Sequence, residues 1–279
     1  MPSWNIHIAH TEQLLGRSGT LSRAVRDRNA FLLGSVVPDI LVGYMVPGIV
    51  DPIPYRVTHF AKPEPIPKPH EDEFWNTYVA PLMTDAGVGA PALPTSLKAE
   101  RERLNRVHYP RFYQGADPVP EPPASEFSVA SADVAQSVLD LTLGVWSHLV
   151  ADNVWNTRVN EFLEAHGGKP SEEFRIKKQG DFDWFGKTLG IDSVPRATER
   201  LYAAAARFPQ YSIPKEYVLK TIGVMHEIVR ENEGDSHHPP YRLLTEDFFD
   251  ATAREVVELA EAGFERRLAS PATPLIESR

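Results

Sequence analysis

The chain has 279 residues, of which 42% are hydrophobic and 24% are charged, an ordinary composition for a globular protein long enough to bury a large core. Its formal charge of −9 argues against general nucleic-acid binding through a basic face, and the absence of cysteine excludes disulfides and thiolate metal ligands. The N-terminus lacks a basic start followed by an apolar run, and no stretch of about eighteen apolar residues occurs. We therefore expect a cytoplasmic protein without a signal peptide or a transmembrane segment.

The N-terminal region predicts two helices. The first covers about residues 4–15, with Ser3 as its N-cap, and it places His7 and His10 on one side at a spacing of three residues. The second is expected over about residues 20–33.

Two polar residues lie in unusual positions after these helices. Asp39 directly follows Pro38 within an apolar stretch, where a carboxylate either caps the next turn or belongs to a functional site. His59 lies in a proline-rich connection over about residues 45–70, which we expect to be extended. A lone histidine in a loop is normally solvated, so His59 is informative only together with other polar residues.

The rest of the chain predicts further helices and no strand. They are expected over about residues 71–83, 96–108, from Ser125 or Ser128 to about 165, 195–206, 215–233 and 245–268. A second proline-rich connection covers residues 110–123, and no internal repeat is found. We predict an all-α, multi-helix bundle that forms a single domain over residues 1–269, followed by a loose tail at 270–279.

The long central helix carries a polar seam in an apolar setting. His148 and Asp152 are four residues apart, and Asn156 follows four residues later, so an α-helix stacks all three on one face. A buried imidazole and carboxylate either share a hydrogen bond within the core or bind a metal.

Polar residues that occupy otherwise apolar sites form a candidate metal site. They are His7, Asp39, His59, His148 and Asp152. All-α folds build metal sites from side chains on several helices in this way. Three imidazoles and two carboxylates suit zinc, with manganese or iron as alternatives.

Four segments that contain these residues resemble the zinc-dependent phospholipase C family, which is related to the fungal single-strand-specific nucleases. They are Met-Pro-Ser-Trp-Asn-Ile-His7, Phe-Leu-Leu-Gly-Ser-Val-Val-Pro-Asp39, Thr-His59-Phe60 and Leu-Gly-Val-Trp-Ser-His148-Leu-Val-Ala-Asp152. The chain also resembles a cytoplasmic bacterial subgroup with Lys178-Gln179 followed by Asp181-Phe182. The resemblance covers roughly residues 1–185 and implies the all-α bundle of this family.

The resemblance also implies a ligand set. Asp39, His59, His148 and Asp152 correspond to the ligands of a principal zinc ion. His7 and Asp152 correspond to part of a second site, which secreted relatives complete with the amine of an N-terminal tryptophan, whereas Trp4 is internal here. The other ligands of secreted relatives have no equivalent at family spacing, and His166, Glu172, Asp181 and His226 are unranked substitutes. One zinc ion is therefore expected, although the family binds up to three.

The activity implied by the resemblance is zinc-dependent hydrolysis of a small-molecule or phospholipid-like phosphodiester, with metal-activated water as the nucleophile and Asp39 as orienting group or base. Arg175, Lys177 and Lys178 are either phosphate-binding residues or an ordinary solvated basic turn. Two alternatives stay open. One is a non-catalytic helical protein with a structural metal or His–Asp network, and the other is a metal-dependent enzyme of different chemistry. The sequence does not indicate the substrate or the oligomeric state.

Overall fold

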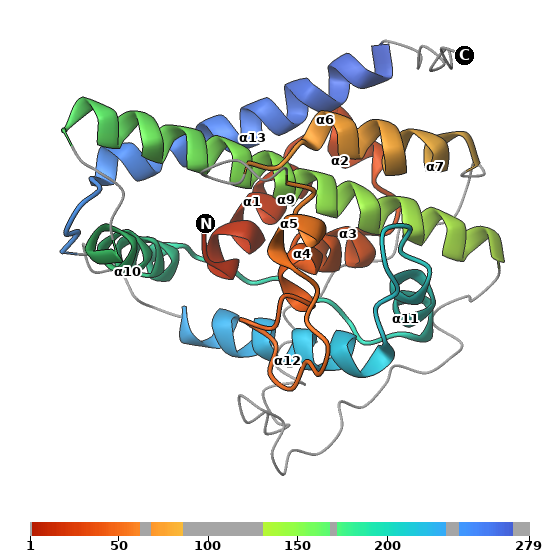
Figure 1. Ribbon diagram of the computed structural model, residues 1–279. Helices are drawn as coiled ribbons and strands as arrows, with labels where there is room; N and C mark the ends of the chain where they lie inside the picture. The colour runs from red at the N-terminus through yellow and green to blue at the C-terminus, as the bar shows by residue number, and fades with distance from the viewer. Residues whose placement is uncertain (1, 62–67, 86–130, 168–171, 233–239, 270–279) are drawn as a thin grey trace, which may run out of the picture.

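The computed structural model describes residues 2–61, 68–85, 131–167, 172–232 and 240–269 (Figure 1). Within these ranges the regular structure is helical, and the only strand-like pairing is an isolated bridge between Ala61 and Pro69. The predicted all-α class is therefore confirmed. The first group of helices is α1 (Trp4–Gly16), α2 (Thr20–Ala24), α3 (Arg28–Gly34), α4 (Val37–Ile40), α5 (Tyr55–Thr58), α6 (Glu71–Phe74), the π-helix η1 (Trp75–Val79) and α7 (Ala80–Asp85). The second group is α9 (Ser131–Ala165), α10 (Glu172–Thr188), α11 (Glu199–Ala206), α12 (Lys215–Glu231) and α13 (Glu246–Ala269).

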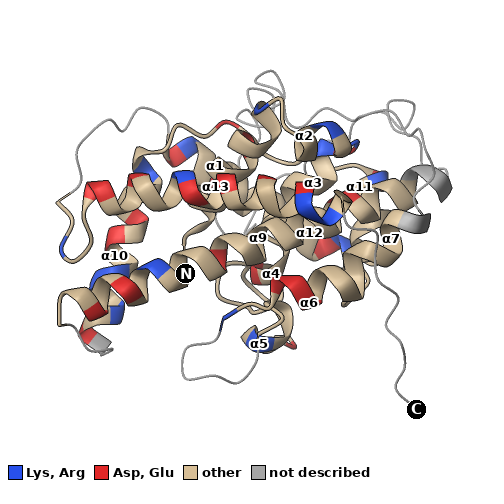
Figure 2. Ribbon diagram, turned by 90° about the horizontal axis from the view of Figure 1, so that it is seen from above, with Lys and Arg blue, Asp and Glu red and all other residues tan. Residues whose placement is uncertain are grey.

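Helix α9 is the axis of the bundle, and α3, α11 and α13 pack directly on it (Figure 1). Among the described residues it is the one helix that is long and apolar enough to cross a membrane, but 94% of its apolar window is buried inside the protein. Its apolar surface is thus covered by other helices, as in the core of a soluble protein. Acidic and basic residues are interspersed along outer helices such as α10 and α13 (Figure 2).

Two glycines allow α3 and α9 to cross in close contact. A Cβ atom on Gly144 would overlap the Phe31 carbonyl oxygen and lie 2.9 Å from the Cα of Gly34. The reciprocal Cβ on Gly34 would overlap the Leu141 carbonyl oxygen. Only residues without side chains fit this crossing, which places the end of α3 directly beside His148.

The predicted helix over 20–33 is wrong as a single element, because the chain breaks between α2 and α3. Asp27 caps α3 by accepting a hydrogen bond from the Ala30 amide at 3.0 Å. The amides of Arg26 and Asp27 donate to Asp140 of α9, the first at 3.1 Å. These bonds satisfy the backbone at the break, and a partner 113 residues away in sequence supplies them.

Aromatic packing attaches α10 and α13 to the C-terminal half of α9. The indole of Trp155 lies 5.2 Å from the ring of Phe182, 6.2 Å from that of Phe185 and 5.9 Å from that of Phe249. No helix was expected between about residue 165 and residue 195, so α10 was not predicted from the sequence. Burial of its phenylalanines, rather than a regular hydrophobic period, explains why this helix forms.

The remaining predictions differ from the structure mainly in detail. The helix over 71–83 is present as α6, η1 and α7, with one π-helical turn in the middle. Ser3 occupies the N-cap of α1 but its side chain makes no capping bond. Helix α11 begins at Glu199 rather than at 195. The helix predicted over 96–108, the connection over 110–123, the start of the central helix at Ser125 or Ser128 and the 270–279 tail lie outside the described residues.

Candidate metal centre

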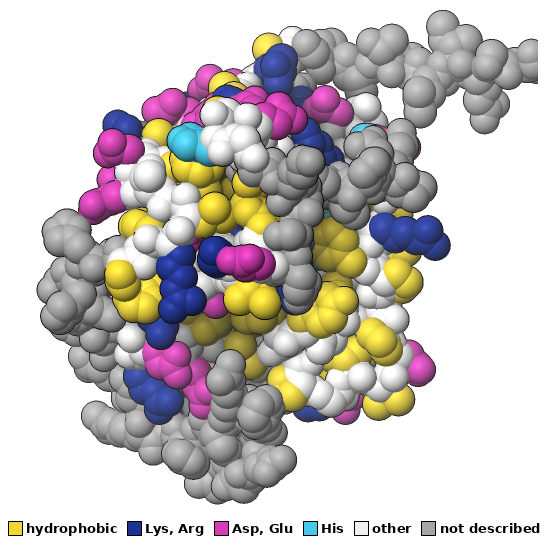
Figure 3. All heavy atoms as spheres, turned by 60° about the vertical axis from the view of Figure 1, so that its left-hand side comes forward, with side chains coloured by type: hydrophobic (Ala, Val, Ile, Leu, Met, Phe, Trp, Pro, Cys, Tyr) yellow, Lys and Arg dark blue, Asp and Glu magenta, His cyan; other side chains and the backbone are white. Residues whose placement is uncertain are grey.

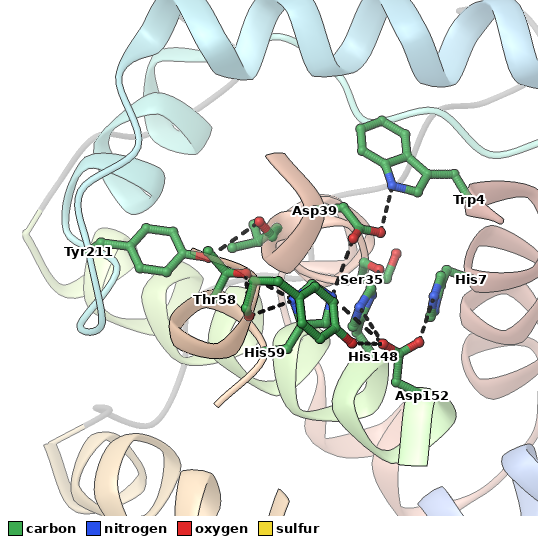
Figure 4. A network of polar contacts seen from close by, with 11 residues as sticks. Trp4, His7, Ser35, Asp39, Thr58, His59, His148, Asp152 and Tyr211 are labelled. Atoms are coloured by element: carbon green, nitrogen blue, oxygen red, sulfur yellow. Dashed lines mark hydrogen bonds and ion pairs between the residues drawn. The ribbon is translucent and has the colours of Figure 1, made fainter. Parts of the chain in front are cut away.

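The five polar side chains singled out in the sequence converge on one place inside the bundle (Figure 4). They form two overlapping groups whose nitrogen and oxygen atoms lie within 4.8 Å of one another: His7 with His148 and Asp152, and Asp39 with His59 and His148. Since His148 belongs to both groups, the five residues surround one position or two adjacent ones.

Helices α1 and α9 supply three of these residues. His148 and Asp152 lie one turn apart on α9, so both point in the same direction. His7 lies on the buried side of α1, where its ring stacks on that of His148 with centroids 3.9 Å apart and planes 12° apart. The stacking brings the edges of the two imidazoles beside the Asp152 carboxylate.

The other two residues come from short turns. Asp39 lies in the single turn of α4, in which Val36 rather than Asp39 occupies the N-cap, so the capping interpretation of this carboxylate is wrong. His59 follows α5 directly, and the next residue, Phe60, has a positive φ of 49°. That conformation is uncommon for a residue with a side chain. Edge-on contacts of Phe60 with Phe74 and Tyr78 hold it, and the turn directs His59 inward.

The spacing of the five side chains matches that of ligands around a metal ion. The Nε2 of His7 lies 3.5 Å from Asp152 Oδ1, and the Nε2 of His148 lies 3.7 Å from Asp152 Oδ2. The Nε2 of His59 lies 3.3 Å from Asp39 Oδ1 and 3.6 Å from Asp152 Oδ2. Two ligand atoms that bind a tetrahedral zinc at about 2.1 Å are about 3.4 Å apart. Most of the observed distances are longer than a good hydrogen bond but suit a shared cation.

Several buried atoms at this place have no hydrogen-bond partner among the described residues. They are the Nε2 atoms of His7, His59 and His148, and Oδ1 of Asp152. Leaving a buried polar atom unpaired costs about 1–3 kcal/mol, and proteins rarely gather several such atoms. A bound cation would satisfy all of them together.

Backbone carbonyls orient two of the imidazoles. His148 Nδ1 lies 2.8 Å from the Ser35 carbonyl oxygen, and His59 Nδ1 lies 3.2 Å from the Tyr55 carbonyl oxygen. Because a carbonyl only accepts, His148 Nδ1 carries the proton and donates it. His59 Nδ1 also lies 2.9 Å from the Thr58 hydroxyl, and since that hydroxyl donates its hydrogen to the Tyr55 carbonyl, His59 Nδ1 is a donor as well. Each Nε2 therefore presents a lone pair to the centre, the usual arrangement of metal-binding histidines.

Electrostatics favour neutral imidazole beside ionised carboxylate. Burial, together with the neighbouring His7, lowers the pKa of the His148 imidazole to about 3. Burial raises the pKa of the Asp152 carboxyl, but the surrounding imidazoles lower it more, so it lies well below its ordinary value. Neutral imidazoles and charged carboxylates are the forms that bind metals. Two buried carboxylates would also balance the charge of a divalent cation.

Two residues that sequence analysis missed support the carboxylates. The indole nitrogen of Trp4 donates to Asp39 Oδ2 at 2.9 Å, and the hydroxyl of Tyr55 donates to Asp152 Oδ2 at 3.1 Å. The only sequence signal was spacing: Trp4 is three residues before His7, and Tyr55 is four residues before His59.

The predicted phosphate-binding residues all lie on α10 but differ in setting. Lys178 is partly buried. Burial lowers the pKa of its amine, and the charge of Asp152 offsets part of this shift. Lys177 forms an ion pair with Glu173 at 2.5 Å on the surface, and Arg175 is exposed. Lys178 is thus electrostatically coupled to Asp152 of the centre.

The three unranked substitute ligands whose side chains are described, His166, Asp181 and His226, do not join the cluster. The carboxylate of Asp181 accepts hydrogen bonds from the amides of Arg242, Leu243 and Leu244 at 2.8–2.9 Å, so it anchors the start of the α13 segment. His166 is exposed just after α9, about 20 Å from Asp152 along the helix.

His226 is buried on α12, outside both groups of candidate ligands. The Glu172 side chain is outside the described part of the structure. His10, predicted to pack beside His7, is a core residue whose Nε2 accepts a hydrogen bond from the Trp155 indole at 3.1 Å.

Comparisons of the chain with protein-family models, with curated proteins and with solved structures find no match.

Proposed function

We propose that the protein is a zinc-dependent hydrolase of a phosphodiester, similar to the zinc-dependent phospholipases C, with its principal metal bound by Asp39, His59, His148 and Asp152 and with His7 beside them. The observation that carries this proposal is the group of unpartnered imidazole nitrogens that face two carboxylates inside the core. Three imidazoles with carboxylates favour zinc over magnesium or calcium, which prefer oxygen ligands alone.

Asp39 is the member of the set that is best placed for catalysis. It keeps 7% of its surface exposed, whereas Asp152 and His59 are at 0%, so Asp39 marks the side from which water and substrate arrive. A bound zinc supplies a Lewis acid and lowers the pKa of a coordinated water to about 7. The Asp39 carboxylate, which accepts a hydrogen bond from Trp4 at Oδ2, would be placed to orient a water molecule at this centre or to accept its proton.

Exposed apolar side chains and a partly buried ammonium group would suit an amphiphilic phosphodiester. Large hydrophobic side chains are exposed on the segment between Asp39 and His59, with Tyr44 at 81% and Val50 at 80% exposure. Lys178 adds a partly buried positive charge on α10. Figure 3 shows hydrophobic, basic and acidic side chains side by side in the middle of one face. Apolar groups would contact the organic part of such a substrate, and the ammonium group would contact its phosphate.

A structural metal site is the second candidate function. His7, His59, His148 and Asp152 have at most 2% of their surface exposed, and structural zinc sites are closed in this way. Such an ion would join α1, α4, the turn after α5 and α9, and so stabilise the bundle without acting on any substrate.

Metal analysis combined with a hydrolysis assay separates these functions. The purified protein is expected to contain zinc and to hydrolyse bis(4-nitrophenyl) phosphate or phosphatidylcholine vesicles. The variant Asp39→Asn tests the role of that carboxylate, because it keeps the size of the side chain and can still accept from Trp4. Zinc retention with lost hydrolysis supports catalysis. Zinc binding without hydrolysis by the unmodified protein supports the structural role, and a metal-free protein contradicts both.

A further inference from the structure

Tyr55 contacts two of the candidate ligands through three parts of its structure. Its ring stacks on the His59 imidazole with centroids 3.7 Å apart. Its carbonyl oxygen accepts from His59 Nδ1, and its hydroxyl donates to Asp152 Oδ2. Tyr55 thus fixes the position of His59, which follows α5, relative to that of Asp152 on α9. The Tyr55 side chain itself is only partly buried.

The hydroxyl of Tyr55 makes the two oxygens of Asp152 different. Oδ2 accepts its hydrogen bond, whereas Oδ1 has no hydrogen-bond partner among the described residues and lies 3.5 Å from His7 Nε2. The donor on Oδ2 fixes the rotation of the carboxylate and leaves this oxygen, which lies 3.6 Å from His59 Nε2 and 3.7 Å from His148 Nε2, with one lone pair for a cation. Trp4 makes the same type of contact with Asp39.

We infer that Tyr55 is a positioning residue that holds Asp152 for binding through a single oxygen and thereby makes the centre selective for a cation of low coordination number. Zinc accepts four ligands with nitrogen donors, whereas Mn²⁺ prefers more ligands and oxygen donors. A carboxylate that is free to bind through both oxygens would favour the larger coordination number. This inference rests on the proposed metal site.

The experiment compares Tyr55→Phe with the unmodified protein and with a matched control. Phenylalanine keeps the ring that stacks on His59 and removes only the hydroxyl, so the fold is expected to persist. The control is Tyr241→Phe, which removes the hydroxyl of a half-buried tyrosine whose ring lies 4.9 Å from that of Phe249, outside both groups of candidate ligands. The measurements are the dissociation constants of Zn²⁺ and Mn²⁺ by chelator competition, and the visible absorption of the Co²⁺-substituted protein, which reports coordination number.

Tyr55→Phe is expected to weaken zinc binding about 10- to 100-fold, the usual effect of losing a partner of a metal ligand. Manganese binding is expected to weaken less, and the cobalt absorption is expected to lose intensity as coordination number rises. Tyr241→Phe is expected to match the unmodified protein in all three measurements.

Equal zinc affinity and an unchanged cobalt spectrum in Tyr55→Phe would overturn the inference while the metal site stands. Equal weakening of zinc and manganese with an unchanged spectrum would also overturn it, because that result indicates general structural damage. If the unmodified protein binds no metal, the proposed site itself is wrong.

Discussion

Substitution of Gly144 by alanine tests how the α3–α9 crossing positions the metal centre. The new Cβ would overlap the Phe31 carbonyl oxygen and lie 2.9 Å from the Cα of Gly34, closer than real Cβ contacts allow. The two helices must therefore separate. Helix α3 ends beside Ser35, whose carbonyl accepts from His148 Nδ1 at 2.8 Å, so separation weakens the bond that orients this imidazole.

The magnitude follows from three contributions. Overpacking a tight interior costs about 1–3 kcal/mol. A buried imidazole N–H that loses its partner costs about 1–3 kcal/mol. Alanine gains about 1 kcal/mol over glycine in a helix interior. We therefore expect Gly144→Ala to lower the free energy of unfolding by about 3 kcal/mol in total.

Urea denaturation of the metal-free protein measures this loss, and zinc competition measures its effect on the centre. Gly180→Ala is the matched control, because a Cβ at this position of α10 meets nothing within 4 Å. It should stabilise the protein by up to about 1 kcal/mol through helix propensity alone. Equal effects of the two substitutions, or a stabilised Gly144→Ala, would refute the close crossing as the reason for the glycine.

Three further predictions concern separate parts of the molecule. His148→Ala should lower zinc content and melting temperature together, because Asp152 stays buried without its partner, as metal analysis and thermal denaturation will show. Asp181→Asn should lower the free energy of unfolding by about 2–4 kcal/mol without changing zinc stoichiometry, because an amide cannot accept all three backbone N–H groups. Asp140→Asn should become more stable relative to the unmodified protein as pH rises from 5 to 8, as urea denaturation at each pH will show.

The sign of the last prediction follows from the pKa of Asp140. Burial raises it from 3.8 to about 8, so the folded state binds a proton that the unfolded state has already lost. Stability that is present below pH 3.8 is therefore lost, by up to about 1.4 kcal/mol per pH unit, as pH rises towards 8. Asparagine does not titrate and removes this loss. A constant stability difference across the pH range would contradict the assignment. Unchanged zinc content in His148→Ala, or loss of zinc in Asp181→Asn, would contradict the other two predictions.

The five candidate ligands could be found from sequence because each is a polar residue in an otherwise apolar or buried setting. His148 and Asp152 lie at helical spacing inside an apolar stretch, and His7, Asp39 and His59 are isolated polar residues in segments that the fold buries. That these side chains meet in space was a hypothesis, because no regular sequence spacing relates positions 7, 39, 59 and 148. The structure brings them together.

The features that sequence analysis missed depend on distant partners. The break before α3 is stabilised by Asp140, far along the chain, so local propensity favoured one continuous helix instead. Helix α10 contains charged residues of both signs and a glycine, Gly180, so its sequence alone does not predict a helix. Its phenylalanines indicate one only when their packing against Trp155 is known. The spacing of Tyr55 from His59 was too weak a signal, because a tyrosine in a proline-rich segment is ordinary and its role depends on the position of Asp152.

Anomalous scattering at the zinc edge from crystals of the purified protein tests the central claim most directly. The account predicts one strong peak among the five side chains, with His148 Nε2 at the bonding distance of about 2.1 Å. Diffraction that shows no ion at this place, with the imidazoles bonded to the carboxylates instead, would contradict it.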